Sequence, residues 1–237
     1  MKVFKGPEKG QSAPIQISET QSDRVLIGLS WDMKQFEKIK LPKPQIMFVK
    51  STIEEIENII HRYRTFKFMD RPVNEHDAPD ARDDDFGHFD IDLYCYIFDE
   101  NGEHVDTVEP DYKNLIDESE TVYHSGDDFS GLGGGDDEQI YIETKKLPAN
   151  YKHFLFVVKS DCAFSLDEVQ NTTIRVADSK TNDDFIKADI SPAANLNAAA
   201  FVFAHMAEID GTWTLTNIGE YADADFDVAA YFKDGLV

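Results

Sequence analysis

The segment HSGDDFSGLGGGDDEQI, residues 124–140, gathers acidic side chains around a run of glycine. Five carboxylates fall within twelve positions, and they belong to Asp127, Asp128, Asp136, Asp137 and Glu138. Carboxylates this close repel one another, and at low dielectric at least one of them would have to bind a proton. A divalent cation removes that cost. The spacing therefore predicts a metal site, with a solvated acidic loop as the alternative.

Calcium suits this set of ligands better than other metals. It accepts six to eight oxygen ligands from carboxylates, carbonyls and water, in a tolerant geometry. Glycine adopts positive φ without steric cost, so the loop can turn its carbonyls inward. Asp90 and Asp92 lie two apart on a strand-like run, so both point to one face and can converge on the same ion. Zinc or copper is disfavoured, because the only nearby nitrogens belong to His88 and His124.

The loop does not match known calcium-binding sequence motifs, and the sequence lacks motifs for nucleophilic catalysis. The EF-hand order is absent, and GLGGGDDE occurs only once, unlike the repeats of calcium β-rolls. Ser130 is not in a GxSxG context, and neither cysteine has a local histidine partner, so no catalytic residues are predicted. The run Asp136, Asp137, Glu138 can hold metals for hydrolysis but offers no evident base. A metal-dependent hydrolase and an acidic protein-interaction module remain the alternatives.

The net charge of −23 limits the classes of molecule that the protein is expected to bind. Residues 77–138 carry 21 acidic and only 2 basic side chains. This charge disfavours binding to nucleic acid, which requires Lys and Arg to displace counterions. No apolar run reaches the length of a membrane span, and the polar start lacks a secretory signal, so we expect a cytoplasmic protein. Cys95 and Cys162 lie in apolar runs and are expected to be buried thiols.

The elements that must position these residues are mainly β. Seven runs have strand length and strand composition: RVLIGLSW (24–31), FDIDLYCYIF (89–98), EQIYIET (138–144), HFLFVVKS (153–160), TTIRVAD (172–178), TWTLTNI (212–218) and FDVAAYF (226–232). They predict a two-sheet antiparallel β-sandwich with a few short helices, in a single domain spanning 1–237. An amphipathic helix is expected over about 51–64, where Ser51 and Glu54 form a capping box, and a weaker one over 194–209.

Four segments resemble the TerD family of tellurium-resistance and bacterial stress proteins. They occur in the family's order: VLIGLSWD (25–32), FDIDLYCYIFDENGEHV (89–105), HSGDDFSGLGGGDDEQIYIETKKLPANYKHFLFVV (124–158) and FSLDEVQNTTIRVAD (164–178). The similarity covers roughly 1–32 and 86–237. Residues 33–85 depart from the family pattern as an insertion that contains the helix over 51–64. The other departure is Asp128, where the family usually has Asn.

The resemblance implies a calcium-binding stress protein of the tellurite-resistance type, acting as a non-enzymatic scaffold or sensor. It implies two calcium ions and other stress-response or tellurite-resistance proteins as partners, with a homo-oligomer as a further possibility. Asp32 is expected to help close the site. The ligands carried over from the family are Asp90, Asp92, Asp127, Asp128, Asp136, Asp137 and Glu138, with carbonyls from Gly133 and Gly135.

Overall fold

In the computed structural model, the side chains of most strands point alternately inward and outward. The structure describes residues 2–20, 23–32, 91–128, 134–160, 166, 169–190, 198–223 and 225–235. All of them belong to one unit, which comprises Met1–Lys34 and His88–Val237. The insertion over 33–85, with its expected helix, lies outside the described residues, and so do Asp90, Gly133 and Cys162.

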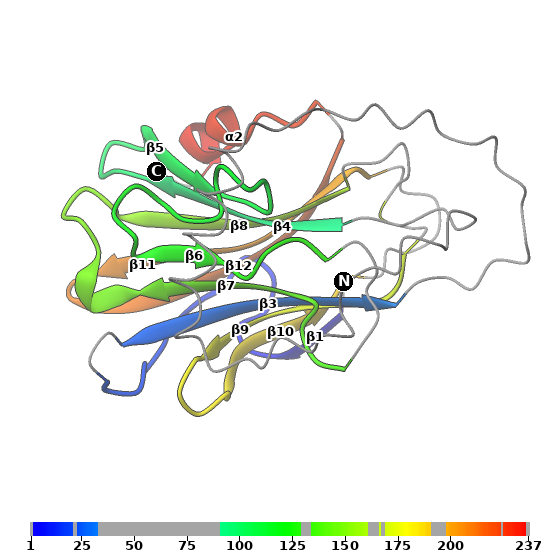
Figure 1. Ribbon diagram of the computed structural model, residues 1–237, viewed down its shortest axis with the longest axis horizontal. Coiled ribbons are helices and arrows are strands. Elements are labelled where there is room, and N and C mark those ends of the chain that lie inside the picture. The colour runs from blue at the N-terminus through cyan, green and yellow to red at the C-terminus, as the bar shows by residue number, and fades with distance from the viewer. Residues whose placement is uncertain are drawn as a thin grey trace, which may run out of the picture. The chain divides into compact units, whose positions relative to one another are not determined.

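Two six-stranded antiparallel sheets make up the described fold (Figure 1). The first, sheet A, has the order β1 (Lys2–Lys5), β10 (Asp184–Asp189), β9 (Gln170–Asp178), β3 (Arg24–Asp32), β7 (Glu138–Glu143), β6 (Val122–His124). The second, sheet B, has the order β2 (Ser12–Pro14), β12 (Thr212–Ala222), β11 (Ala200–Ile209), β8 (His153–Ser160), β4 (Ile91–Phe98), β5 (His104–Val108). The predicted β-sandwich is confirmed. A short 3-10 helix, η2 (Thr144–Lys146), follows β7.

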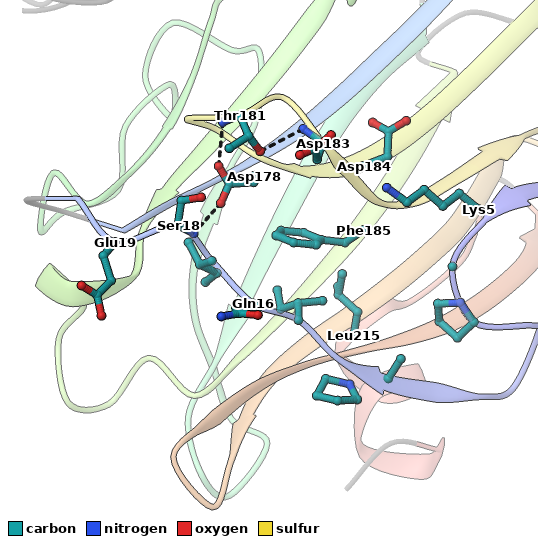
Figure 2. Close-up of a pocket in the computed structure, with 16 residues that line it drawn as sticks. Lys5, Gln16, Ser18, Glu19, Asp178, Thr181, Asp183, Asp184, Phe185 and Leu215 are labelled. Carbon is teal, nitrogen blue, oxygen red and sulfur yellow. Dashed lines mark hydrogen bonds between the residues drawn. The ribbon is translucent and has the colours of Figure 1, made fainter.

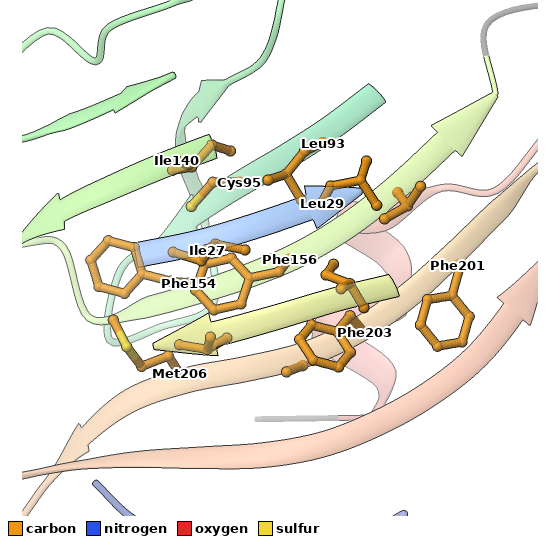
Figure 3. Close-up of a cluster of buried hydrophobic side chains, with 14 of the residues drawn as sticks. Ile27, Leu29, Leu93, Cys95, Ile140, Phe154, Phe156, Phe201, Phe203 and Met206 are labelled. Carbon is orange, nitrogen blue, oxygen red and sulfur yellow. The ribbon is translucent and has the colours of Figure 1, made fainter. Parts of the chain in front are cut away.

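The main core lies between the two sheets. Every second residue of β3 points into it, and Val25, Ile27 and Leu29 are fully buried there. Fully buried side chains from both sheets meet in this layer, and Figure 3 labels Leu93, Cys95, Ile140, Phe154, Phe156, Phe201, Phe203 and Met206 among them. Burial of each large apolar side chain contributes roughly 1.5–3 kcal/mol, so this layer fixes the position of both sheets. Cys95 is a buried thiol as expected, and burial raises its pKa well above the ordinary value.

A helix at the end of the chain, α2 (Val228–Gly235), covers the outer face of sheet B. Phe232 stacks on Phe98 with ring centroids 4.0 Å apart. It also contacts two stacked imidazoles, those of His153 and His205, at 5.3 and 5.5 Å. The imidazoles are joined by a hydrogen bond of 3.0 Å between His153 Nδ1 and His205 Nε2. Sheet B is therefore buried on both faces along β8 and β11.

Two predicted elements were wrong. Residues 200–209 form strand β11, not part of a helix over 194–209. Its apolar run lacks strand alternation because Phe201 and Phe203 face the main core while Val202 packs under α2. Conversely, the strand expected over 226–232 is largely helix α2, capped by Asp227, whose carboxylate accepts hydrogen bonds from the amides of Ala229 and Ala230 at 3.0 Å each.

Within the described part of the chain, no helix combines the length and the apolar character that crossing a membrane requires.

Candidate metal centre

Glu138 brings a carboxylate to the end of the layer between the sheets. It is the first residue of β7, whose inward positions are Glu138, Ile140 and Ile142. Its side chain is fully buried, and its Oε2 accepts a hydrogen bond of 2.8 Å from the amide of Leu93 in the opposite sheet. Its Oε1 accepts a longer bond of 3.3 Å from the amide of Asp128. One carboxylate thus connects both sheets and the start of the acidic loop.

Asp92 and Asp127 join Glu138 in a single cluster. One carboxylate oxygen from each of the three lies within 4.8 Å of the others. Asp92 is 3% exposed, whereas Asp127 is exposed. Strand β4, strand β7 and the loop after β6 therefore supply one ligand each, and the exposed Asp127 places the cluster within reach of solvent.

His124 lies beneath this cluster and is fully buried. Its Nδ1 accepts a hydrogen bond of 3.0 Å from the amide of Gly126, which leaves the proton on Nε2. Nε2 lies 3.3 Å from Oε2 of Glu138, in a geometry that makes no hydrogen bond. Burial lowers the pKa of His124 to about 4, against an opposing effect of Asp127. The imidazole is therefore neutral at pH 7 and does not offset the charge of Glu138.

Lys159 is the basic residue nearest to Asp92 in the strand register. The two residues are cross-strand partners in β8 and β4. Its ammonium lies 4.7 Å from the ring centre of Tyr94 and 5.0 Å from that of Tyr96, and it donates a hydrogen bond to the Tyr96 hydroxyl. Lys159 thus lies on the same face of sheet B as Asp92, with its ammonium held over the two aromatic rings.

The cluster fits a calcium ion by its donor chemistry. Its three side chains offer only carboxylate oxygens, which hard cations prefer. Ionised carboxylates are costly to bury, and Asp92 and Glu138 are both buried. A divalent cation placed among these oxygens would offset much of that cost. Asp127 itself is exposed, so the cluster is open to the water ligands that calcium usually keeps.

Two other aspartates of the acidic loop, Asp136 and Asp137, bind protein groups in the structure. Asp137 accepts a hydrogen bond of 2.9 Å from the amide of Trp31, and its own amide donates to the Leu29 carbonyl at 2.8 Å. Asp136 forms a forked ion pair with Arg175, with Arg175 Nη2 2.7 Å from Asp136 Oδ2 and Nε 2.9 Å from Oδ1. Its hydrogen bonds to Asp136 hold the pKa of Arg175 above the ordinary value.

Two further predicted ligands, Gly135 and Asp32, have other roles in the structure. Gly135 adopts a φ of +108°, which glycine tolerates and which turns the chain into β7. Asp32 is exposed at the end of β3, where its Oδ2 accepts a hydrogen bond of 2.7 Å from Asn171. Of the predicted ligands that lie within the described residues, the structure brings Asp92, Asp127 and Glu138 together.

A cavity of about 870 Å³ opens at one edge of the sandwich (Figure 2). Apolar side chains that include Ile15, Phe185 and Leu215 line it together with acidic ones that include Asp183 and Asp184. Asp178 closes one end by accepting hydrogen bonds from the amides of Ser18 and Thr181, residues that Figure 2 places on two separate segments. The cavity contains none of the three clustered carboxylates and is a separate feature of the fold.

Two residues of the site were missed as functional residues by sequence reasoning. His124 was counted only as a nearby nitrogen, although a histidine inside the run TVYH, directly before the acidic loop, was the available signal. Arg175 stands in TTIRVAD, where a charged residue at an outward strand position is ordinary. Its pairing with Asp136 joins positions 39 residues apart, which no local pattern reveals.

Comparison with known proteins agrees with this fold and these motifs. The TerD domain family matches residues 74–231. The chain belongs to the TerD family. Its relatives include the tellurium resistance protein TerZ of Serratia marcescens, which is 30% identical over 130 residues, covering 55% of this chain and 65% of TerZ. They also include general stress protein 16U of Bacillus subtilis, which is 28% identical over 144 residues, covering 57% of this chain and 72% of that protein.

Solved structures show the same TerD fold. The crystal structure of a homologue of telluride resistance protein (TerD) from Streptomyces coelicolor superimposes with a TM-score of 0.54 and 17% sequence identity. The alignment covers 88% of this chain and 94% of that one. This TerD chain is thus of the tellurium-resistance and stress-protein type.

Proposed function

We propose that this protein is a calcium-binding stress protein that acts as a non-enzymatic sensor or scaffold. The observation that carries the proposal is the cluster of Asp92, Asp127 and Glu138, whose carboxylate oxygens lie within 4.8 Å of one another. Two of these side chains are buried and one is exposed, so an ion can reach the site from solvent while Asp92 and Glu138 remain fixed by strands of the sandwich.

A sensor role follows from where the ligands come from. Glu138 is fixed by β7 and by its contact with Leu93, whereas Asp127 is an exposed residue on the chain that follows β6. Ion binding would hold that segment against the rigid pair of Asp92 and Glu138. The surface around the acidic loop then differs between the calcium-free and calcium-bound states, and partner proteins of the stress response would recognise the bound state.

Calorimetric titration of calcium into chelator-stripped protein tests this function, with magnesium titrated in parallel. We expect saturable calcium binding, weaker magnesium binding, and loss of calcium binding in Asp92→Asn. Glu100→Gln removes one exposed carboxylate from a turn outside the cluster and serves as the charge-matched control. The same titration measures stoichiometry and so tests the expectation of two ions. A wild-type protein that shows neither a heat of calcium binding nor a rise in melting temperature with calcium, or an Asp92→Asn variant that binds normally, would refute the proposed site.

A further inference from the structure

A slot on the outer face of sheet A holds the carboxylate of Asp136. Gly28 of β3 is the register partner of Gln139 on one side and of Arg175 on the other, so the three residues form a row across three adjacent strands. A methyl group added at Gly28 would stand 2.3 Å from the carboxylate carbon of Asp136. Because Gly28 has no side chain, the carboxylate of Asp136 can occupy the space over it.

Hydrogen bonds from both sides of the row fix the carboxylate in this slot. Arg175 donates to both of its oxygens, and Nε2 of Gln139 donates to Oδ2 at 3.2 Å. Arg175 is itself held in place, since its Nη1 lies 3.0 Å from Asp184 and its Nη2 lies 2.8 Å from the side-chain oxygen of Asn182. The Asp136 side chain is only 8% exposed, so its oxygens are committed to these donors.

Asp136 and Glu138 lie on opposite faces of sheet A. Gln139, Gly28 and Arg175 occupy outward positions, because their neighbours Ile27, Ile140 and Ile174 point into the core. Glu138 faces inward with Ile140 and reaches the amide of Leu93 in the other sheet. The backbone of the chain entering β7 therefore separates the Asp136 carboxylate from the clustered ligands.

We propose that Asp136 is a positioning residue and not a calcium ligand: its forked pairing with Arg175 over Gly28 fixes the chain that enters β7, so that Glu138 faces Asp92. The inference rests on the proposed calcium site. Between Asp136 and Glu138, the hydrogen bonds of Asp137 to Leu29 and Trp31 continue the same anchoring along β3. Arg175 thus acts on the ion only through the backbone geometry of β7.

A double-mutant cycle on Asp136→Asn and Arg175→Gln separates positioning from direct ligation. Calcium affinity is measured by calorimetry for the wild type, both single variants and the double variant. Loss of a residue that orients metal ligands typically weakens metal binding roughly 10- to 100-fold. We expect each single variant to fall in that range and the double variant to be no weaker than the weaker single one. Glu100→Gln, which removes an exposed carboxylate outside both the anchor and the cluster, should change affinity little.

A direct ligand would give the opposite pattern. If Asp136 bound calcium, Arg175→Gln would release its carboxylate and tighten binding, and adding Asp136→Asn to Arg175→Gln would weaken binding further. Either result overturns the inference. Arg175→Lys separates charge from geometry, since lysine cannot form the fork. Wild-type affinity in Arg175→Lys would mean that charge alone acts, and would also count against positioning.

The calcium-free protein provides a readout that does not depend on binding. Amide chemical shifts of Leu93 and Trp31, the donors to Glu138 and Asp137, are expected to move in both single variants and to move no further in the double variant. Unmoved shifts would refute the positioning role even if calcium binds. Failure of the wild type to bind calcium, with the shifts coupled as expected, would refute the proposed function while leaving the Asp136–Arg175 anchor supported.

Discussion

At the scale of single residues, the buried carboxylate of Glu138 contributes to the stability of the fold through a hydrogen bond. The amide of Leu93 donates to its Oε2 from the opposite sheet, so this polar contact crosses the sandwich. The side chain is fully buried, and removing the acceptor leaves a buried N–H group without its partner. Such an orphaned donor costs free energy whether or not an ion is bound.

We therefore expect Glu138→Ala to destabilise the calcium-free protein by about 1–3 kcal/mol, the usual cost of a buried unsatisfied polar group. Glu138→Gln keeps an oxygen that can accept from Leu93 and should cost less. Urea denaturation in the presence of chelator measures both free energies of unfolding. Equal losses in the two variants would show that the contact with Leu93 does not contribute to stability.

The two histidines beneath α2 make stability depend on pH. Burial, and then the neighbouring His153, lower the pKa of His205 to about 4 from an ordinary value of 6.5. The folded state therefore binds fewer protons than the unfolded chain between these pH values. The free energy of unfolding contributed by His205 is full above pH 6.5 and is lost as the pH falls to about 4.

The expected loss from His205 is at most about 3.5 kcal/mol, because its pKa falls from 6.5 to about 4 and one pKa unit corresponds to about 1.4 kcal/mol. Denaturant unfolding at pH 7 and at pH 4.5 should show a smaller loss of stability in His205→Gln than in the wild type. His104 is exposed, so His104→Gln should lose as much as the wild type. An unchanged pH dependence in His205→Gln would contradict this assignment.

At the scale of elements, strand β3 holds the last part of the acidic segment, Asp136 and Asp137, in place. Gly28 accommodates Asp136, and the next residues in the strand bind the backbone and carboxylate of Asp137.

Gly28→Ala should displace Asp136 from Arg175 and weaken both stability and calcium affinity. Combining it with Asp136→Ala removes the collision, so in that background Gly28→Ala should cost little. Melting temperature and calorimetry measure the two effects, and a Gly28→Ala variant like the wild type would refute this packing.

Strands were predictable from sequence where one face is buried and the other is not. The run EQIYIE alternates because Gln139 and Tyr141 face outward, and β7 was predicted correctly. Strand β11 is buried on both faces, so its apolar run resembles a helix of the interior. In α2 the capping residue Asp227 was visible in the sequence, but the apolar spacing after it also suits a strand. Short strands such as β2 and β6, with three residues each, are too brief to produce a pattern.

Site residues were predictable in kind but not in role. The acidic segments pointed to Asp92, Asp127 and Glu138, which the fold brings together. Neighbouring aspartates in the same loop look alike in sequence, yet Asp136 and Asp137 contact Arg175 and Trp31. Which carboxylate faces the cluster depends on the turn at Gly135 and on pairing with β3, and both are properties of the folded chain.

At the scale of the whole molecule, the clustered ligands come from distant parts of the sequence and from both sheets. Asp92 and Glu138 are 46 positions apart and meet only when the sandwich is closed. An ion that binds there binds the native state and not the unfolded chain, so it raises stability by mass action. The acidic net charge of −23 further favours the uptake of a cation over that of an anion.

Calcium at a hundred times its dissociation constant should therefore add about 2.7 kcal/mol to the free energy of unfolding. For a chain of this size that corresponds to a rise of roughly 5–11 °C in melting temperature. Thermal unfolding with chelator and with calcium measures the shift, and Asp92→Asn should abolish it. A shift that persists in Asp92→Asn would indicate that calcium acts by general charge screening.

The outermost strands of the two sheets are short. Strands β1, β6, β2 and β5 are four, three, three and five residues long, whereas β3, β9, β11 and β12 in the interior are nine to eleven. A short edge strand has few unpaired backbone N–H and C=O groups with which a strand of another molecule could pair, and this limits edge-to-edge aggregation. Together with mutual repulsion between highly acidic copies, these short edge strands disfavour strand pairing between copies of the protein.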